Sequence, residues 1–116
     1  MKTSASYRLL RTINGCTSVA RIELSATEVE GRTDIHPLWF AAATRGIDAA
    51  SRAVGTRQRW WISSFLGSMV DTDDGAAWAA GAMAVFDALE LDVTLLFERG
   101  WTIVLPSGQR LRFDDP

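Results

Sequence analysis

The chain has 116 residues and a net charge of −2 at pH 7, and this length predicts one domain, residues 1–116, with a hydrophobic core of its own. Its basic residues form no run that could neutralise a phosphate backbone, so the composition argues against nucleic acid as a partner. Cys16 is the single cysteine, which excludes an internal disulfide and favours a reducing, cytoplasmic compartment.

The N-terminal part predicts a β-hairpin. Residues 7–13 are suited to a strand, and Asn14-Gly15 is the strongest short signal for a hairpin turn. On the return strand, small and apolar residues alternate toward one face, namely Ala20, Ile22, Leu24 and Ala26. Residues 1–10 lack the apolar stretch of a signal peptide, so we expect no secretion by that route.

A helix is predicted after a polar loop. Pro37 suits the first helical position, and Gly55 suits the end of the helix. Between them, apolar residues recur at helical spacing and predict a core stripe of Phe40, Ala43, Ile47, Ala50 and Val54.

The middle of the chain changes from strand to helix periodicity. Residues 59–66 alternate like a strand, and residues 73–90 follow the helical period. The longest uncharged run, residues 75–86, is shorter than the ~20 residues that cross a bilayer, so it predicts a buried helix and no membrane partner.

Acidic residues mark the start of this second helix. Asp71 or Thr72 is the predicted N-cap, and Asp73 and Asp74 then lie in the first turn, where the helix dipole favours negative charge. These acids also suggest a Mg²⁺ or Ca²⁺ cluster, or the DxDD motif of a proton-initiated cyclase, but a metal needs more hard ligands than this loop supplies. We therefore predict capping, with no metal and no cofactor.

The C-terminal residues 91–113 predict a β-meander. Apolar residues alternate in three short segments that are separated by turns at Arg99-Gly100 and Pro106-Ser107-Gly108. With the preceding elements, this order predicts an α+β fold: a ββαβα core over residues 7–90, then the meander, with the helices on one face of the sheet.

Three short segments carry a resemblance to domain IV of bacterial elongation factor G. The acidic loop and helix start resemble the family's VDSSE-x-AFKxAxSxAF segment at Val70-Asp71-Thr72-Asp73-Asp74, Ala76, Ala80 and Ala84. Residues 42–50, AATRGIDAA, resemble its AVQKGIEEA helix, and residues 19–24, VARIEL, resemble its HVVIEL strand. The resemblance covers about residues 7–89 and implies a ribosomal protein S5 domain 2-like ββαβα core.

The chain departs from this family at the loop before the second helix. In the family, this loop carries a histidine at the tip that enters the ribosomal decoding site. Here Gly67-Ser68-Met69-Val70 forms a shorter loop without a histidine, and the connection of residues 28–36 is also shortened. The resemblance therefore implies the fold, whereas a role in translocation is not implied.

Tryptophans and arginines are the best candidates for ligand contact. Trp60 and Trp61 are adjacent on a strand and must point to opposite faces. One of them packs under the helices, and the other is covered by an oligomer partner or by the C-terminal meander, or else offers an aromatic platform. With Trp39, they supply stacking area, while Arg57 and Arg59 are suited to a carboxylate. This set favours a peptide or a small acidic ligand.

Acid–base candidates gather before the first helix. His36 is the single histidine and has an ordinary pKa close to neutrality, and Glu28, Glu30 and Asp34 precede it. His36 with Glu28 and Glu30 is the candidate catalytic set, with Asp34 as a further ligand contact; the alternative role of His36 is a helix cap. Cys16 has no activating partner in the sequence, so we do not expect a catalytic thiol.

Three functions compete. In size and aromatic content, the chain is similar to the proteins that close the lysinoalanine bridge of duramycin-type and cinnamycin-type lanthipeptides; this resemblance implies a peptide-binding enzyme of secondary metabolism that orients a lysine toward a dehydroalanine. The alternatives are a ribosome-associated mimic of elongation factor G domain IV, and a non-catalytic interaction or immunity module. We also expect a homodimer, because open sheet edges invite pairing.

Overall fold

The computed structural model describes residues 3–13, 15–30, 34–98 and 100–113. Eight elements follow one another: β1 (Ser4–Ile13), β2 (Cys16–Ser25), α1 (Pro37–Val54), β3 (Trp61–Leu66), α2 (Asp74–Ala88), β4 (Thr94–Phe97), β5 (Trp101–Val104) and β6 (Arg110–Arg112). They form two antiparallel sheets of order β1-β2-β3 and β4-β5-β6. The predicted α+β class and C-terminal meander are thus confirmed.

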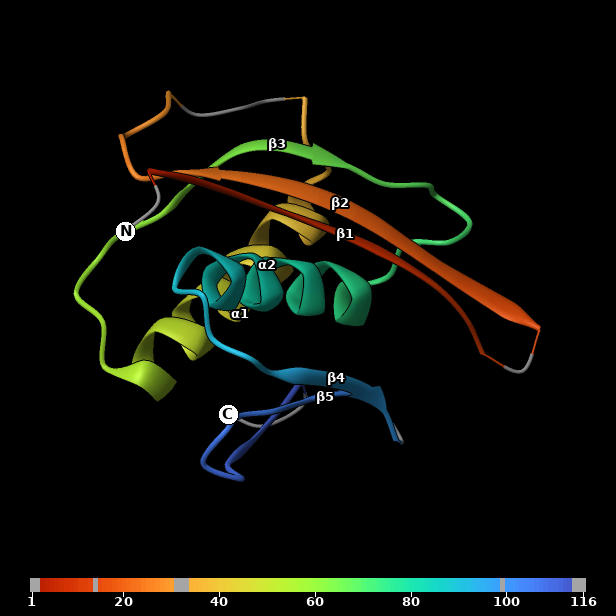
Figure 1. Cartoon of the computed structure of the whole chain (residues 1–116). Coiled ribbons are helices and arrows are strands. Elements are labelled where there is room, and N and C mark those ends of the chain that lie inside the picture. Colours follow the sequence, from red (N-terminus) through yellow and green to blue (C-terminus); the bar gives the residue numbers. More distant parts are fainter. Residues whose placement is uncertain (1–2, 14, 31–33, 99, 114–116) are drawn as a thin grey trace.

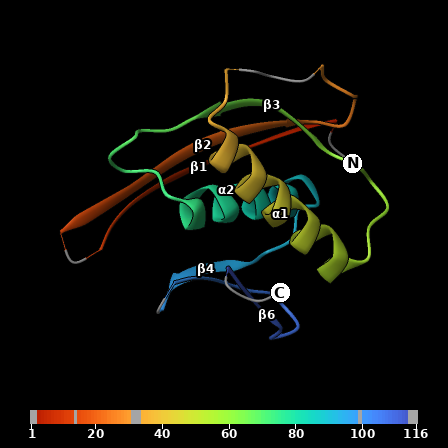
Figure 2. The ribbon, with the colours of Figure 1, turned by 180° about the vertical axis from the view of Figure 1, so that it is seen from behind.

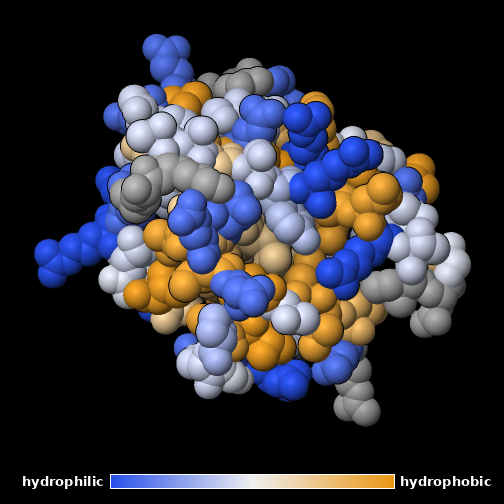
Figure 3. Space-filling model, viewed as in Figure 1, coloured by the Kyte–Doolittle hydropathy of each residue, from blue (hydrophilic) through white to orange (hydrophobic). Residues whose placement is uncertain are grey.

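The meander forms a second sheet instead of extending the first, which differs from the single sheet we expected. Figure 1 shows three layers, with both helices between the two sheets. The reason lies in α2, of whose fifteen residues twelve are buried, so that one sheet cannot cover it. On the face in Figure 3, hydrophobic residues gather over the middle layer, where Figure 1 places α2. In the described part of the chain, neither helix has the length and apolarity to traverse a bilayer.

The N-terminal hairpin has the predicted register. Ile13 pairs with Cys16, so two residues connect the strands, and Gly15 adopts a φ of 82°, which a side chain would disfavour. Asn14 lies outside the described residues, as does Arg99 of the predicted second turn. Three of the four predicted inward residues are at most 1% exposed, namely Ala20, Ile22 and Leu24.

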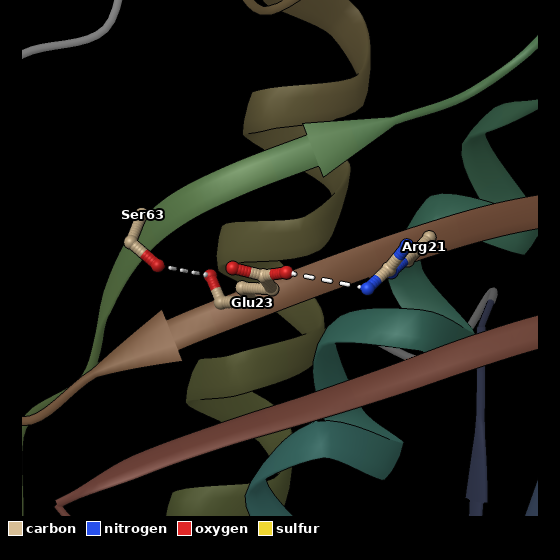
Figure 4. A network of polar contacts seen from close by, with 3 residues as sticks. All are labelled: Arg21, Glu23 and Ser63. Atoms are coloured by element: carbon tan, nitrogen blue, oxygen red, sulfur yellow. Dashed lines mark hydrogen bonds and ion pairs between the residues drawn. The ribbon is translucent and has the colours of Figure 1, made fainter.

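A β-bulge in β3 interrupts the strict alternation that the sequence suggests. Glu23 pairs with Ser64 but Leu24 pairs with Ile62, so Ser63 is the extra residue. Figure 4 shows its hydroxyl donating to the Glu23 carbonyl at 3.1 Å, beside the ion pair of Arg21 and Glu23. Because of the bulge, Ile62 and Phe65 both face the core, at 6% and 7% exposure.

Helix α1 begins and ends where the sequence predicts. Pro37 is its first residue, and Gly55 follows its last residue in the left-handed conformation, with φ 69°. Ala43, Ile47 and Ala50 of the predicted stripe are buried. Phe40 departs from the prediction, because 38% of its surface is exposed.

The two helices cross at two glycines. A Cβ on Gly46 would lie 2.1 Å from the Trp78 carbonyl oxygen, and a Cβ on Gly81 would lie 2.4 Å from the Ala43 carbonyl oxygen. Real Cβ atoms do not approach backbone so closely. Each helix therefore needs a glycine at the crossing so that the backbone of the other helix can approach.

The cap of α2 corrects the sequence prediction. The N-cap is Asp73, whose carboxylate accepts from the Ala76 amide at 2.8 Å, rather than Asp71 or Thr72. The Thr72 hydroxyl accepts instead from the Ser68 amide at 2.8 Å and donates to the Val19 carbonyl. Thr72 thus closes the loop against β2 and is unavailable to the helix.

One arginine links the two sheets across the helix layer. The Arg11 guanidinium on β1 donates to the Leu95 carbonyl of β4 at 2.8 Å and lies 6.0 Å from the centre of the Trp101 ring. Burial raises the pKa of the neighbouring Tyr7 phenol, and the charge of Arg11 and its hydrogen bond partly offset this. Arg11 therefore connects residues far apart in the sequence.

We predict that Gly46→Ala destabilises the protein by about 2–3 kcal/mol, because the added methyl group overlaps the α2 backbone. A loss of stability is informative, because alanine is intrinsically a better helix former than glycine by about 1 kcal/mol and would otherwise stabilise the helix. Urea unfolding measures the change. Ala41→Gly at an exposed position of α1 is the control, and it should lower the free energy of unfolding only by the difference in helix propensity. A Gly46→Ala variant that is more stable than the wild type would contradict the close crossing.

We also predict that Asp73→Ala lowers the free energy of unfolding by about 1 kcal/mol, through loss of the cap. Asp71→Ala is the matched control, because the Asp71 backbone, rather than its side chain, makes the hydrogen bonds at this corner. Both variants are compared by urea unfolding. Equal losses from the two substitutions would argue against Asp73 as the cap.

Candidate functional site

A groove between α1 and residues 56–62 gathers the predicted ligand contacts. Its volume is about 460 Å³, within the range of small-ligand sites. One side is a face of α1 that carries Phe40, Thr44, Ile47, Asp48 and Ser51. The other side carries four residues that the sequence singled out: Arg57, Arg59, Trp60 and Trp61.

Local hydrogen bonds hold the segment that forms this second side. The Gln58 amide donates to the Thr56 hydroxyl at 3.2 Å, and the Gln58 side chain donates to the Arg59 carbonyl at 2.6 Å. Gly55 turns the chain out of α1 just before this segment. The arginines are thus carried on a short, internally bonded connection between a helix and a strand.

The two tryptophans of the groove differ in environment, as their adjacent positions predict. Trp60 is 8% exposed and belongs to the core, whereas Trp61 is half-buried. The Arg59 guanidinium lies 5.4 Å from the centre of the Trp61 ring, in a cation–π contact. This stacking positions a positive charge and an aromatic surface side by side.

The Trp60 indole nitrogen is buried and has no hydrogen-bond partner in the described part of the chain. A buried donor without an acceptor costs roughly 1–3 kcal/mol. Trp60 also belongs to the lining of the groove. No other buried side-chain nitrogen or oxygen of the described residues lacks a partner.

His36 lies in a different hollow, at the start of α1. Its Nδ1 accepts from the Leu38 amide at 3.2 Å, so it caps the helix, and its ring lies 5.0 Å from that of Trp39. With Nδ1 as an acceptor, Nε2 carries the hydrogen of a neutral ring. In this arrangement, the Nδ1 lone pair is engaged by the N-terminus of the helix. The hollow, about 510 Å³, also includes Met69, Thr72, Asp73 and Phe113.

The structure does not place the acid–base candidates in the groove. Glu28, Glu30 and Asp34 are exposed residues of the connection between β2 and α1. Neither they nor His36 belong to the lining of the groove, and Trp39 belongs to the His36 hollow instead. The predicted set is therefore divided among the groove, the His36 hollow and the connection between β2 and α1.

Sequence reasoning missed the helical side of the groove. Phe40, Thr44, Ile47 and Ser51 recur at intervals of three and four residues, so they share one face of α1. That spacing is present in the sequence, but Phe40 and Ile47 also fit the predicted core stripe, so the sequence assigns this face to the core. The position of residues 56–62 beside α1 leaves part of this face open as a groove.

Comparison of the chain with family models, with curated proteins and with solved structures finds no match in any of the three.

Cys16 is free and exposed. Within the described residues, no three His, Cys, Asp or Glu side chains gather into a set that could hold a metal ion.

Proposed function

We propose that this protein is a small peptide-binding enzyme of secondary metabolism, which holds a modified peptide in the groove between α1 and residues 56–62. The observation that carries the proposal is the gathering of Arg57, Arg59, Trp60 and Trp61 in one cavity of about 460 Å³. A guanidinium stacked on an indole suits a peptide, because it can contact a carboxylate while the ring covers an apolar side chain.

The proposed reaction is addition of a lysine amine to a dehydroalanine, which forms a lysinoalanine cross-link. A bond forms between the lysine Nζ and the dehydroalanine Cβ while the π bond between Cα and Cβ breaks; the amine loses a proton and Cα gains one. Atoms and electrons balance without an oxidant or a cofactor. Since His36, Glu28 and Glu30 do not line the groove, the proposed source of rate is orientation of the two reacting groups.

We also propose that the core has the ribosomal protein S5 domain 2-like topology of domain IV of elongation factor G. The element order β1-β2-α1-β3-α2 supports it.

A second candidate function, an interaction module, is favoured by the loop between β3 and α2, where Met69 and Val70 are 75% and 90% exposed. Exposed apolar side chains beside acidic ones suit a protein partner better than ribosomal RNA.

A homodimer is also proposed. In the described part of the chain, β1 pairs only with β2, so the outer edge of a ten-residue strand is open to a second copy. Leu10 on this strand is 58% exposed. An open edge of this length that carries an exposed leucine favours association.

The peptide proposal predicts that a dehydrated, cyclised lanthipeptide with a free lysine binds the protein and closes its bridge faster in its presence. Arg59→Ala and Trp61→Ala should each weaken binding about tenfold, as loss of one good contact does, and should slow closure as well. Arg8→Ala on the exposed side of β1 is the matched control. Bridge closure is scored by resistance to thiol addition.

Nuclear magnetic resonance adds a local measurement to this experiment. The indole proton of Trp60, assigned with Trp60→Phe, should shift downfield when the peptide supplies an acceptor. A wild type that binds no peptide and does not speed closure would reject the enzyme, and the interaction module would replace it. Binding without a change at Trp60 or in the two groove variants would move the site elsewhere.

The homodimer is tested by sedimentation velocity at micromolar concentration. We expect wild-type dimer, and we expect Leu10→Lys to shift the population toward monomer, since lysine guards exposed edges. Leu38→Lys is the control, because Leu38 is similarly exposed at 62% but lies on α1. A wild type that sediments only as monomer is the contrary result.

A further inference from the structure

A second cavity lies between α1 and the C-terminal sheet. Its volume is about 410 Å³, and it is lined by residues of α1, by Trp78 of α2 and by Leu111, Arg112 and Phe113 at the end of the meander. Figure 2 shows α1 in front, with β6 beneath it. Asp48 lines both this cavity and the peptide groove, so the two cavities lie on either side of one helix.

Positive charge dominates the lining of this cavity. The lining includes three arginines, Arg45, Arg52 and Arg112, and one carboxylate, that of Asp48. Arg21 and Arg110 elsewhere in the protein each have a carboxylate within 4 Å, at 3.6 and 3.4 Å. Within the described residues, Arg52 and Arg112 have no such partner. The cavity therefore holds guanidinium donors that are not already neutralised.

Aromatic rings form the apolar part of the same cavity. The Trp78 and Phe113 rings are 5.9 Å apart at 62°, and the Arg45 guanidinium lies 5.7 Å from the centre of the Phe113 ring. Trp78 is 3% exposed, so the ring is fixed by the core. Besides its charged residues, α1 contributes the small side chains of Ala49 and Ala53 to the lining, which leave the hollow open.

We propose that this cavity binds a small organic anion, in which a carboxylate or a phosphate is attached to an aromatic ring. The anionic group lies between Arg52 and Arg112, and the ring packs on Trp78 and Phe113. Guanidinium groups bind both kinds of anion through charge-assisted hydrogen bonds, and 410 Å³ suits a ligand of this size. This site is separate from the peptide groove and does not depend on the function proposed for it.

Isothermal titration with phenyl phosphate and with phenylacetate tests the site in the full chain. We expect saturable binding of at least one of them, and the ratio of the two dissociation constants identifies the preferred anion. Arg52→Gln and Arg112→Gln should each weaken binding about tenfold. Both side chains are exposed, so the variants should keep the fold, which circular dichroism checks.

Two arginine variants outside the cavity serve as controls. Arg8→Gln controls for the loss of one exposed positive charge, and Arg57→Gln controls for binding in the peptide groove; both should leave the dissociation constant unchanged. The proposal is overturned if neither aromatic anion binds, or if the cavity variants bind as tightly as the controls. Equal binding of neutral 2-phenylethanol would exclude recognition of the charge, and equal binding of inorganic phosphate would exclude recognition of the ring.

Discussion

The close crossing of α1 and α2 is the contact on which the rest of the structure depends. Gly46 and Gly81 leave no room for a Cβ, because each faces a backbone carbonyl of the other helix. The layer between the sheets is therefore thin, and small residues replace the large side chains that usually separate helices. Less area is buried per residue in such a layer, so large side chains from both sheets, among them Leu9, Ile22, Leu24 and Ile103, complete the core.

Both cavities are consequences of how this layer is assembled. Helix α1 forms one wall of each cavity, and Asp48 stands on the ridge between them. Because α2 fixes α1 at the glycine crossing, the positions of Phe40 and Thr44 in the groove and of Arg45 and Arg52 in the second cavity are set together. A change in the crossing angle would alter both cavities at once.

Local signals predicted the elements well, and tertiary contacts decided what the sequence could not predict. Pro37 and Gly55 mark the bounds of α1 because their backbone preferences act locally. The cap of α2 was misassigned because Thr72 is bound to β2, a contact that no local pattern records. The predicted ligand contacts Arg57, Arg59, Trp60 and Trp61 lie in one groove because they are neighbours in the sequence, whereas the arginines of α1 and Arg112 share a cavity only through the packing of the second sheet.

The bond between Arg11 and the Leu95 carbonyl spans 84 positions of sequence, and it has a consequence for the order of folding. The first hairpin and both helices are synthesised before β4, β5 and β6, the strands of the second sheet, which cover one side of α2. Until those strands emerge, an almost entirely apolar helix is open to solvent on that side. Because loops this long close late, docking of the last sheet completes the fold, and a nascent chain that stops before it would be prone to aggregation.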